Sequence, residues 1–289
     1  MKMIKNTVRS ALKISAYMYP EFCAKTHYFI KFKKKLNLTN PTNFNEKIQW
    51  LKFNEYNGDI YTLCADKYKV REYISSKGCD EILNVLYGVY DDPQDIDYNA
   101  LPNKFALKCN HGAGYNIICN NKSSLDFEKT NKQLSKWLKE DFSANFIEPQ
   151  YKKIERKILC EKYIENEQGD FPDDYKFYCF NGKPYAVMVC KERKNGNPKF
   201  YYFDMNWNPL PFEDTVELIN KNDYPEMPDG FQKMKDYAIK LASDFKFVRA
   251  DFYLLNGYVI FGELTFTPSA GLDVTLREAD AILGNQLKL

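Results

Sequence analysis

The sequence predicts an α+β fold, in which antiparallel hairpins are interleaved with helices, rather than a doubly wound parallel sheet. Two Asn-Gly dipeptides, Asn181-Gly182 and Asn256-Gly257, each lie between two apolar runs. Such a dipeptide between apolar runs is the strongest short-range signal for a β-hairpin. Between the two predicted hairpins, residues 231–245 carry apolar side chains at the spacing of an amphipathic helix. We therefore expect antiparallel strands and helices in one chain.

The N-terminal region, residues 1–60, is rich in Lys and aromatic residues and is predicted to be helical. Asn43, with Glu46 shortly after it, predicts the capped start of a helix that turns Ile48 and Leu51 inward. A second helix is predicted over residues 64–78, because Gly78 is a typical residue at the end of a helix.

The middle of the chain predicts short strands and one polar helix. Alternating apolar patterns mark strands, and a polar stretch around Trp137 marks the helix. The predicted strand segments are 105–110, 115–120, 157–164, the hairpin 175–193 and 200–212. Neither repeats nor low-complexity linkers interrupt these elements.

Chain length and charge narrow the range of functions. The 289 residues suffice for one large domain or for two to three small ones. Lys and Arg number 41 against 39 Asp and Glu, so the net charge of +2 predicts no nucleic-acid partner. One local cluster, Lys31, Lys33, Lys34 and Lys35, is typical of a solvated face. Alternatively, it could touch an anionic membrane surface or a phosphorylated substrate.

The cysteines and the N-terminus indicate a cytoplasmic protein. None of the eight cysteines lies in a Cys-x-x-Cys pair, so we expect small core side chains in a reducing compartment. With only two histidines, a His/Cys zinc site is not expected. The N-terminus has no uninterrupted apolar signal segment, and no stretch approaches the ~20 apolar residues that span a bilayer. Any membrane contact should be peripheral.

The last predicted hairpin carries the strongest chemical signal. A turn at Asn256-Gly257 brings Asp251 and Glu263 side by side, with the hydroxyl of Thr265 close by. Hard carboxylate oxygens facing one cavity suit Mg²⁺. Arg249 shares the strand face of Asp251, because side chains alternate, and a guanidinium there can hold charge that develops in a transition state. The alternative is that both acids are solvated strand-end residues.

A glycine loop follows a predicted strand. Lys108 ends the strand, and Gly112 and Gly114 follow, so the backbone could wrap closely around phosphate oxygens while the lysine supplies charge. The loop lacks the Gly-Lys-Ser/Thr ending of a Walker loop, and the alternative is an ordinary β-turn. Glu161 and Asp174 stand at other strand ends, where a carboxylate can bind a ribose.

Together these motifs resemble the ATP-grasp ligase superfamily, in the same order from about Asp66 onward. The shared motifs are Asp66-Lys67, Lys108 with the glycine loop, Glu161-Lys162-Tyr163-Ile164, Asp174-Tyr175-Lys176, Arg249-x-Asp251, Glu263-x-Thr265 and Pro268-Ser269-Ala270-Gly271. Two further segments, Phe44–Lys52 and Asp66–Tyr73, specifically resemble the teichuronopeptide-biosynthesis (TupA-like) ATP-grasp family.

The resemblance implies ATP and Mg²⁺ as cofactors and assigns residue roles. The implied ATP-binding residues are Lys67, Lys108, Gly112, Gly114, Glu161, Lys162, Tyr163, Ile164 and Asp174. The implied Mg²⁺ ligands are Asp251, Glu263 and Thr265. The implied catalytic residues, which would stabilise the acyl-phosphate and the tetrahedral intermediate, are Arg249 and Lys176. The superfamily usually has Asn at the position of Thr265, whose hydroxyl can still bind one Mg²⁺.

The implied architecture is an ATP-grasp fold with two α+β lobes that grip ATP. Its expected parts are a helical N-terminal region (1–60), an α/β part (61–103), a lid subdomain (104–164) and a C-terminal subdomain with the metal site (165–289). The implied reaction is ATP-dependent amide formation through an acyl-phosphate. The carboxylate would belong to a uronic acid of a surface polysaccharide or to its nucleotide-sugar precursor, and the partner would be a small amine or amino acid.

Two other classes of protein remain open. A glycosyltransferase of polysaccharide biosynthesis would usually present an Asp-x-Asp motif at a strand end, and the one such spacing, Asp95-x-Asp97, lies in a polar turn. A non-catalytic scaffold would lose the metal site, yet Asp251, Glu263 and Lys108 are all present.

Overall fold

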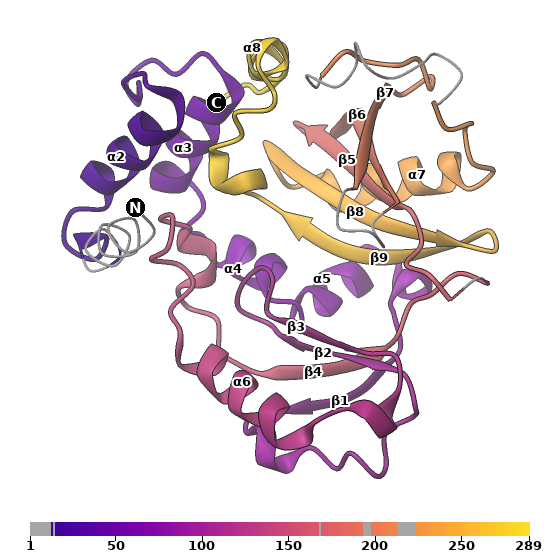
Figure 1. Ribbon diagram of the computed structural model, residues 1–289. Helices are drawn as coiled ribbons and strands as arrows, with labels where there is room; N and C mark the ends of the chain where they lie inside the picture. The colour runs from indigo at the N-terminus through magenta and orange to yellow at the C-terminus, as the bar shows by residue number, and fades with distance from the viewer. Residues whose placement is uncertain (1–12, 14, 168, 193–197, 213–223) are drawn as a thin grey trace.

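The computed structural model describes residues 13, 15–167, 169–192, 198–212 and 224–289 (Figure 1). The helices are α2 (Pro20–Phe32), α3 (Phe44–Asn54), α4 (Asp59–Ala65), α5 (Val70–Ser76), α6 (Phe127–Lys139), α7 (Phe231–Ala242) and α8 (Glu278–Gln286). The strands are β1 (Leu86–Tyr90), β2 (Phe105–Cys109), β3 (Asn116–Cys119), β4 (Ile158–Lys162), β5 (Asp174–Phe180), β6 (Lys183–Lys191), β7 (Lys199–Asp204), β8 (Phe247–Leu255) and β9 (Tyr258–Thr265). Residues 1–12 and 14 of the predicted helical region and Arg193 of a predicted hairpin lie outside the described residues.

The strands form two antiparallel sheets, so the predicted α+β class is confirmed. The smaller sheet has the order β1-β4-β2-β3 and the larger has β7-β6-β5-β8-β9. Figure 1 shows the larger sheet above the smaller one, with α8 and the C-terminus close to α3. Strand β1 from the segment 61–103 pairs with β4 from the segment 104–164, and the division between these two segments stays a prediction.

Both predicted hairpins form, and the turn chemistry explains why. Asn256 and Gly257 have φ of 49° and 78°, and Asn181 and Gly182 have φ of 49° and 79°. Positive φ at both central residues matches the right-handed twist of the flanking strands, and Asn-Gly adopts it most readily. The turns join β8 to β9 and β5 to β6.

Helix α3 begins where the sequence predicts. Oε2 of Glu46 accepts hydrogen bonds from the backbone N–H groups of Asn43 and Thr42, at 3.4 and 3.0 Å. A carboxylate in the first turn that reaches back to unpaired N–H groups stabilises a helix start. Ile48 and Leu51 are fully buried, as expected from their spacing.

The helix predicted over residues 64–78 forms only in part, because the chain leaves the helical conformation between α4 and α5. Oδ1 of Asp66 accepts hydrogen bonds from the backbone N–H groups of Tyr68 and Lys69, at 2.8 and 3.3 Å, and from the Asn110 side chain at 2.8 Å. Short acidic side chains that bond nearby backbone groups compete with helical hydrogen bonds. Gly78, with φ of 64°, ends the second helix as predicted.

Helices cover the outer sides of the two sheets. Helix α7 packs on β5, β6 and β8, and the apolar residues that its sequence turns inward, Met234, Ala238 and Leu241, are fully buried. Helix α6 packs on β2 through Leu134, which is also fully buried. All eight cysteines are buried, as expected for core side chains. None of the helices in the described part of the chain combines the length and apolar character needed to cross a bilayer.

Candidate active site

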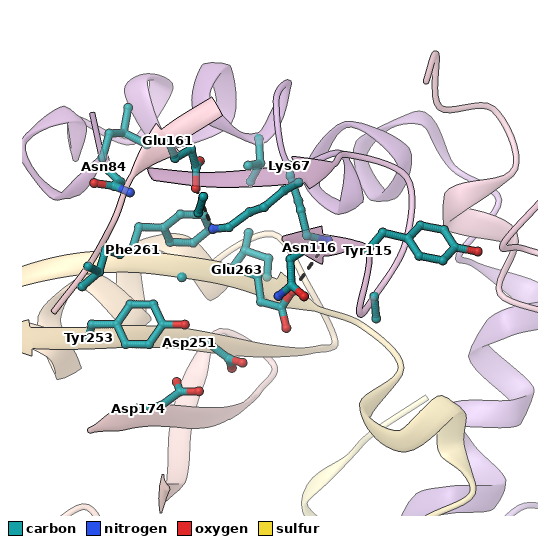
Figure 2. Close-up of a pocket in the computed structure, with 18 of the residues that line it drawn as sticks. Lys67, Asn84, Tyr115, Asn116, Glu161, Asp174, Asp251, Tyr253, Phe261 and Glu263 are labelled. Carbon is teal, nitrogen blue, oxygen red and sulfur yellow. Dashed lines mark hydrogen bonds and ion pairs between the residues drawn. The ribbon is translucent and has the colours of Figure 1, made fainter. Parts of the chain in front are cut away.

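A cavity of about 270 Å³ lies between the two sheets. It is lined by most of the predicted site residues, namely Lys67, Lys108, Gly114, Glu161, Lys162, Tyr163, Ile164, Asp174, Lys176, Asp251 and Glu263. In Figure 2, Glu161 comes from the smaller sheet, Asp174, Asp251 and Glu263 come from the larger one, and Lys67 comes from the break between α4 and α5. Gly112, Arg249 and Thr265 are predicted site residues that do not line it.

The two carboxylates at the centre of the site are cross-strand partners. Asp251 of β8 pairs with Glu263 of β9, so the hairpin brings them side by side as its turn predicts. A β-bulge at Gly262 interrupts the pairing directly beyond them. A Cβ at Gly262 would lie 2.9 Å from the carbonyl oxygen of Asp251, so only glycine fits there without a backbone shift.

Asp251 is held by two cations. Arg249 donates from Nε and Nη2 to the two carboxylate oxygens, at 2.8 and 2.7 Å, and Lys176 donates to Oδ2 at 2.7 Å. Lys176 also pairs with Asp174 at 2.6 Å. Burial opposes the charge of Lys176, but the carboxylates of Asp251, Asp174 and Glu263 together outweigh burial and raise the pKa of Lys176 above its ordinary value. The lysine therefore stays protonated at neutral pH.

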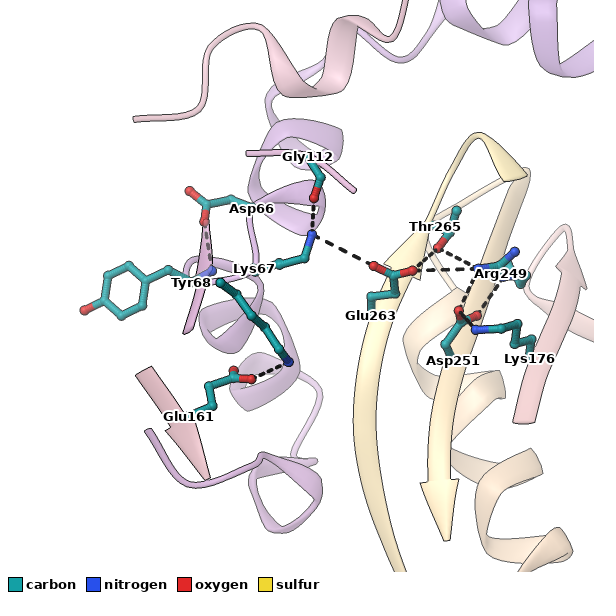
Figure 3. A network of polar contacts seen from close by, with 11 residues as sticks. Asp66, Lys67, Tyr68, Gly112, Glu161, Lys176, Arg249, Asp251, Glu263 and Thr265 are labelled. Atoms are coloured by element: carbon teal, nitrogen blue, oxygen red, sulfur yellow. Dashed lines mark hydrogen bonds and ion pairs between the residues drawn. The ribbon is translucent and has the colours of Figure 1, made fainter. Parts of the chain in front are cut away.

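Glu263 is the accessible carboxylate, with 40% of its side chain exposed against 2% for Asp251. Burial opposes its ionisation, yet the cations Lys67, Lys176 and Arg249 outweigh burial and lower its pKa to about 2. Figure 3 shows it between Lys67 on one side and the Arg249 network on the other. Glu263 is therefore ionised across the physiological range.

The donor set fits Mg²⁺. Oε2 of Glu263 lies 4.0 Å from the Lys67 ammonium, beyond hydrogen-bond distance, so its lone pairs are available to a cation. Mg²⁺ is usually held by one or two carboxylates together with water and substrate phosphates. No cluster of three His, Cys, Asp or Glu side chains in the described residues could hold a metal alone. The pair would therefore need nucleotide or water oxygens to complete the coordination.

Thr265 is placed behind the carboxylates. Its hydroxyl donates to Oε1 of Glu263 and accepts from Arg249, both at 3.2 Å. Both contacts orient Glu263 and Arg249 (Figure 3). The direct role of Thr265 as a metal ligand stays a prediction.

Two lysines face the carboxylates from the smaller sheet and the helix break. The Lys67 ammonium donates to the carbonyl oxygen of Gly112, and burial lowers its pKa against the opposing effect of Glu263. Lys108 of β2 pairs with Glu161 of β4 at 2.6 Å. Burial opposes the charge of Lys108, but Glu161 together with Tyr253 and Glu263 outweighs burial and raises the pKa of the lysine. Both cations line the cavity, and their role in binding phosphate oxygens stays a prediction.

The glycine loop connects β2 to β3 beside these lysines. At Gly112 a Cβ would lie 2.6 Å from the Phe142 ring, so a close aromatic contact requires glycine there. Gly114 has φ of 77°, a conformation that residues with side chains rarely adopt, and it lines the cavity. The loop is therefore shaped by both glycines, and its function as a lid over phosphates stays a prediction.

The rest of the cavity is more apolar and includes residues that the sequence analysis missed. Tyr253 follows Arg249 and Asp251 at two-residue spacing, so strand alternation could have found it. Asn84 precedes β1 and reaches the cavity by donating to the Lys162 carbonyl oxygen at 2.9 Å. No local pattern signals that contact. Arg71, Asn116 and Phe261 were also missed.

The other sequence candidates lie elsewhere. Asp95 and Asp97 are exposed in the loop after β1 and do not line the cavity, which removes structural support for an Asp-x-Asp sugar-nucleotide site there. The lysines of the 31–35 cluster are exposed at the end of α2.

The chain is similar to several solved structures of ligases and synthetases. The L-amino acid ligase from Bacillus licheniformis is 11% identical, with a TM-score of 0.51 over 94% of this chain and 63% of that one. The D-alanine–D-alanine ligase from Bacillus anthracis complexed with ATP is 12% identical, with a TM-score of 0.45 over 77% of this chain and 60% of that one. The ADP complex of the N5-carboxyaminoimidazole ribonucleotide synthetase purK is 13% identical, with a TM-score of 0.46 over 76% and 50%.

The chain thus spans 50–63% of the length of these structures. Comparison with curated proteins finds no match. The family model described as TupA-like ATPgrasp matches residues 46–288, which is most of the sequence. The resemblance inferred from the motifs is therefore confirmed, and the chain belongs to the TupA-like family of ATP-grasp proteins.

Proposed function

We propose that the protein is an ADP-forming ligase that joins a carboxylate to an amine, with ATP bound between the two sheets. The observation that carries the proposal is the placement of Asp251 and Glu263 opposite Lys67 and Lys108 in one cavity. The carboxylates suit a divalent cation and the lysines suit phosphates. Membership of the ATP-grasp family supports ATP as the ligand.

The proposed reaction has two steps. A carboxylate oxygen attacks the γ-phosphorus of ATP, the bond to the β-phosphate oxygen breaks, and an acyl-phosphate and ADP form. The amine nitrogen then attacks the acyl carbon, phosphate leaves, and the nitrogen loses a proton. Positioning and charge supply most of the catalysis in such chemistry, so no covalent protein nucleophile is needed.

The residues of the cavity would divide this work. Lys67 and Lys108 would neutralise phosphate charge, and the segment Glu161–Ile164 would line the base and ribose. Mg²⁺, held by Asp251 and Glu263, would supply further neutralisation at the β- and γ-phosphates. Lys176 lines the cavity and would meet developing charge directly. Arg249 does not line it, so Arg249 would act through the Asp251 carboxylate that it fixes.

The proposed substrates rest on the family resemblance. The carboxylate would be a uronic acid, polymeric or nucleotide-linked, and the amine a small amine or amino acid. A cytoplasmic location, where ATP is supplied, belongs to the same proposal. Glycosyl transfer is the weaker alternative, since Asp95 and Asp97 do not line the cavity.

A turnover assay tests the reaction class. The full chain is incubated with MgATP, glucuronic acid or its nucleotide conjugate, and a panel of amines. We expect ADP and phosphate only when carboxylate and amine are both present. Hexose transfer from a sugar nucleotide without ATP consumption would contradict the ligase and favour the transferase.

A matched pair of variants tests the site. Glu263→Ala should abolish ADP formation and leave the fold intact, because it removes a partly exposed metal ligand rather than core packing. Asp97→Ala, an exposed acid outside the cavity, should leave ADP formation unchanged. The reverse pattern would place the chemistry at the Asp-x-Asp turn.

A further inference from the structure

A surface on and beside α2 exposes apolar and basic side chains together; we name it the basic–aromatic patch. Its exposed apolar members are Tyr17, Met18, Tyr19, Phe22, Phe29 and Ile30. Its exposed lysines are Lys25, Lys31, Lys33, Lys34 and Lys35. The one acid between Tyr17 and Lys35 is Glu21, which pairs with Lys25 at 2.5 Å. With Asp141, which accepts a hydrogen bond from Tyr17 at 2.7 Å, two acids stand beside these five lysines, so the patch is both apolar and cationic.

The patch is not the core-facing side of the helix. Cys23, Ala24 and Tyr28 bury the opposite face of α2 in a small cluster with other apolar residues. Phe22 and Phe29 turn outward and are 65% and 53% exposed. Single exposed apolar residues are ordinary, but a contiguous group of this kind marks an interaction surface. Figure 1 shows α2 at one side of the molecule, away from the two facing sheets.

The charge and the aromatic content together select the partner. Lysines attract anionic lipid headgroups, and aromatic side chains insert at the boundary between headgroups and acyl chains. A phosphorylated ligand would engage the lysines and leave Phe22 and Phe29 in water. A second copy of the chain would bring like charges together. We propose that the basic–aromatic patch docks the protein on the surface of an anionic lipid membrane.

Vesicle sedimentation of the full chain tests this proposal. We expect binding to vesicles of phosphatidylcholine mixed with phosphatidylglycerol, weaker binding at high salt, and none to phosphatidylcholine alone. The triple change Lys33→Glu, Lys34→Glu and Lys35→Glu should weaken binding at least about tenfold. The double change Phe22→Ser and Phe29→Ser should weaken vesicle binding by a similar factor relative to the parent protein, at low and at high salt.

The control is Tyr258→Ser, which removes an exposed aromatic residue outside the patch and should bind like the parent protein. Absence of binding to the anionic vesicles would overturn the proposal. Loss of binding in the lysine variant alone would also overturn it, because the lysines would then bind headgroup phosphate without insertion of the aromatic side chains. Dimers that depend on the patch would overturn it as well, because they would indicate a second copy as the partner. Thermal unfolding of each variant confirms that it folds.

The loop Pro268–Gly271, which follows β9, has an unusual backbone conformation. Ser269, Ala270 and Gly271 have φ of 47°, 56° and 63°. Residues with side chains rarely hold such values, and they persist where surrounding contacts force them. The residues that contact the loop should therefore be those that keep its backbone in this conformation.

Helix α3 supplies those contacts from two buried polar side chains. Gln49 donates to the carbonyl oxygens of Ala270 and Gly271, both at 2.9 Å. Lys52 donates to the same Ala270 oxygen at 2.7 Å and to the Phe146 oxygen at 2.9 Å. Both donors are 1% exposed. A buried ammonium is costly, and apolar packing commonly gives equal or greater stability, so stability alone does not explain Lys52.

The position of the loop relative to Asp251 and Glu263 indicates which part of the site it borders. Along β8, Tyr253 and Asp251 line the cavity, and Arg249 lies beyond them; along β9, Glu263 is followed by Thr265 and then by the loop. The nucleotide would enter from the Tyr253 end, which is also the end of β5 that begins at Asp174. The loop therefore lies beyond the other end of the carboxylate pair, outside the cavity lining, and in the proposed ligase the attacking carboxylate would approach from there.

We infer that Gln49 and Lys52 are positioning residues, which hold the loop Pro268–Gly271 as a wall of the site for the carboxylate substrate. The inference rests on the proposed ligase function. Both residues act through the loop and do not touch the cavity. Substitution of either residue should therefore weaken the use of the carboxylate substrate and leave nucleotide binding unchanged.

Steady-state kinetics and calorimetry test the inference. Lys52→Met should raise KM for the carboxylate at least about tenfold, since small misplacements near reacting groups have effects of this size. The affinity for ATP alone should change less than about twofold. Gln49→Glu, which keeps the shape and places acceptors opposite carbonyl oxygens, should show the same split. Gln49→Glu also replaces Lys52→Met as the test variant if Lys52→Met does not fold.

Lys47→Met is the matched control. This lysine lies on the same helix but donates to the Gly284 and Leu287 carbonyl oxygens at the end of α8, at 2.9 and 2.7 Å. Equal effects of the Lys47 and Lys52 variants on the carboxylate KM would show a merely structural role. If the parent enzyme forms ADP but Lys52→Met has an unchanged KM for the carboxylate, the role of Lys52 and Gln49 is overturned and the ligase function stands. A parent enzyme that forms no ADP with any substrate pair would overturn the ligase as well.

Discussion

Glu263 and Asp251 differ in what surrounds them, although they are cross-strand partners. Asp251 is almost fully buried and shares its oxygens with Arg249 and Lys176. Glu263 is partly exposed and faces the cavity with its nearest cations at 3.7 and 4.0 Å. The two acids thus have separate roles: Asp251 organises the cations, and Glu263 is the ligand that a metal can reach first.

The low pKa of Glu263 predicts a pH dependence of stability. Its pKa falls from 4.5 to about 2 on folding, so between these values the unfolded chain binds the proton and the folded chain does not. The stability that Glu263 contributes is therefore present above pH 4.5 and is lost as the pH falls toward 2. In Glu263→Gln, the free energy of unfolding should fall less steeply with pH over this range. Urea unfolding of both proteins at about pH 5 and about pH 3 measures the difference; parallel losses would contradict it.

Lys108 predicts a loss of nucleotide affinity. Lys108→Met should raise the ATP dissociation constant at least about tenfold, equivalent to about 1.4 kcal/mol, because it removes a cation from the cavity wall. Lys104→Met is the control: Lys104 forms an exposed ion pair with Glu165 and does not line the cavity. Exposed pairs contribute little, so that variant should bind ATP normally. Calorimetry that finds equal affinities for the two variants would reject the role of Lys108.

At the scale of elements, the β8–β9 hairpin organises the metal site. Alternation along β8 places Arg249, Asp251 and Tyr253 at two-residue intervals. The register of the pairing then sets Glu263 against Asp251 and Thr265 against Arg249. A slip of one residue would turn each strand's set to the opposite face. The turn and the bulge therefore determine the site as much as the polar residues do.

Two glycines of this hairpin predict different defects. Gly257 has φ of 78°, and a Cβ added there would meet no atom within 4 Å, so Gly257→Ala should cost about 1 kcal/mol of stability and spare ATP binding. Gly262→Ala would press on the Asp251 backbone and should weaken Mg²⁺-dependent ATP binding strongly. Urea unfolding and calorimetry on both variants separate these effects. Normal ATP binding by Gly262→Ala would show that the bulge does not set the site.

At the scale of the whole molecule, the cavity is lined by both sheets, so a nucleotide bound there should stabilise them together. A nonhydrolysable ATP analogue with Mg²⁺ at 100 times its dissociation constant would add about 2.7 kcal/mol. That corresponds to a rise of about 5 °C in Tm for a chain of this size. Calorimetric scans measure it. Chelation of Mg²⁺ should reduce the shift, and an equal shift with and without Mg²⁺ would argue against the carboxylate pair as its site.

Much of the fold could be predicted because it depends on short-range chemistry. The Asn-Gly turns, the start of α3 at Asn43 and the periodicity of α7 each depend on residues close in sequence. The adjacency of Asp251 and Glu263 follows from a turn between them. The helix break at Asp66 escaped prediction, because its carboxylate is held by Asn110 from the loop after β2. That break carries Lys67 to the cavity.

By itself, the sequence determined the hairpins, the cross-strand carboxylates and the family, because local turn geometry and motif order are written in consecutive residues. Only the tertiary structure decided which residues close the site. Asn84 meets the Lys162 carbonyl, and Lys52 meets the loop at Ala270, across long stretches of chain. Such contacts depend on how the sheets and helices pack, and no periodicity or spacing in the sequence encodes them.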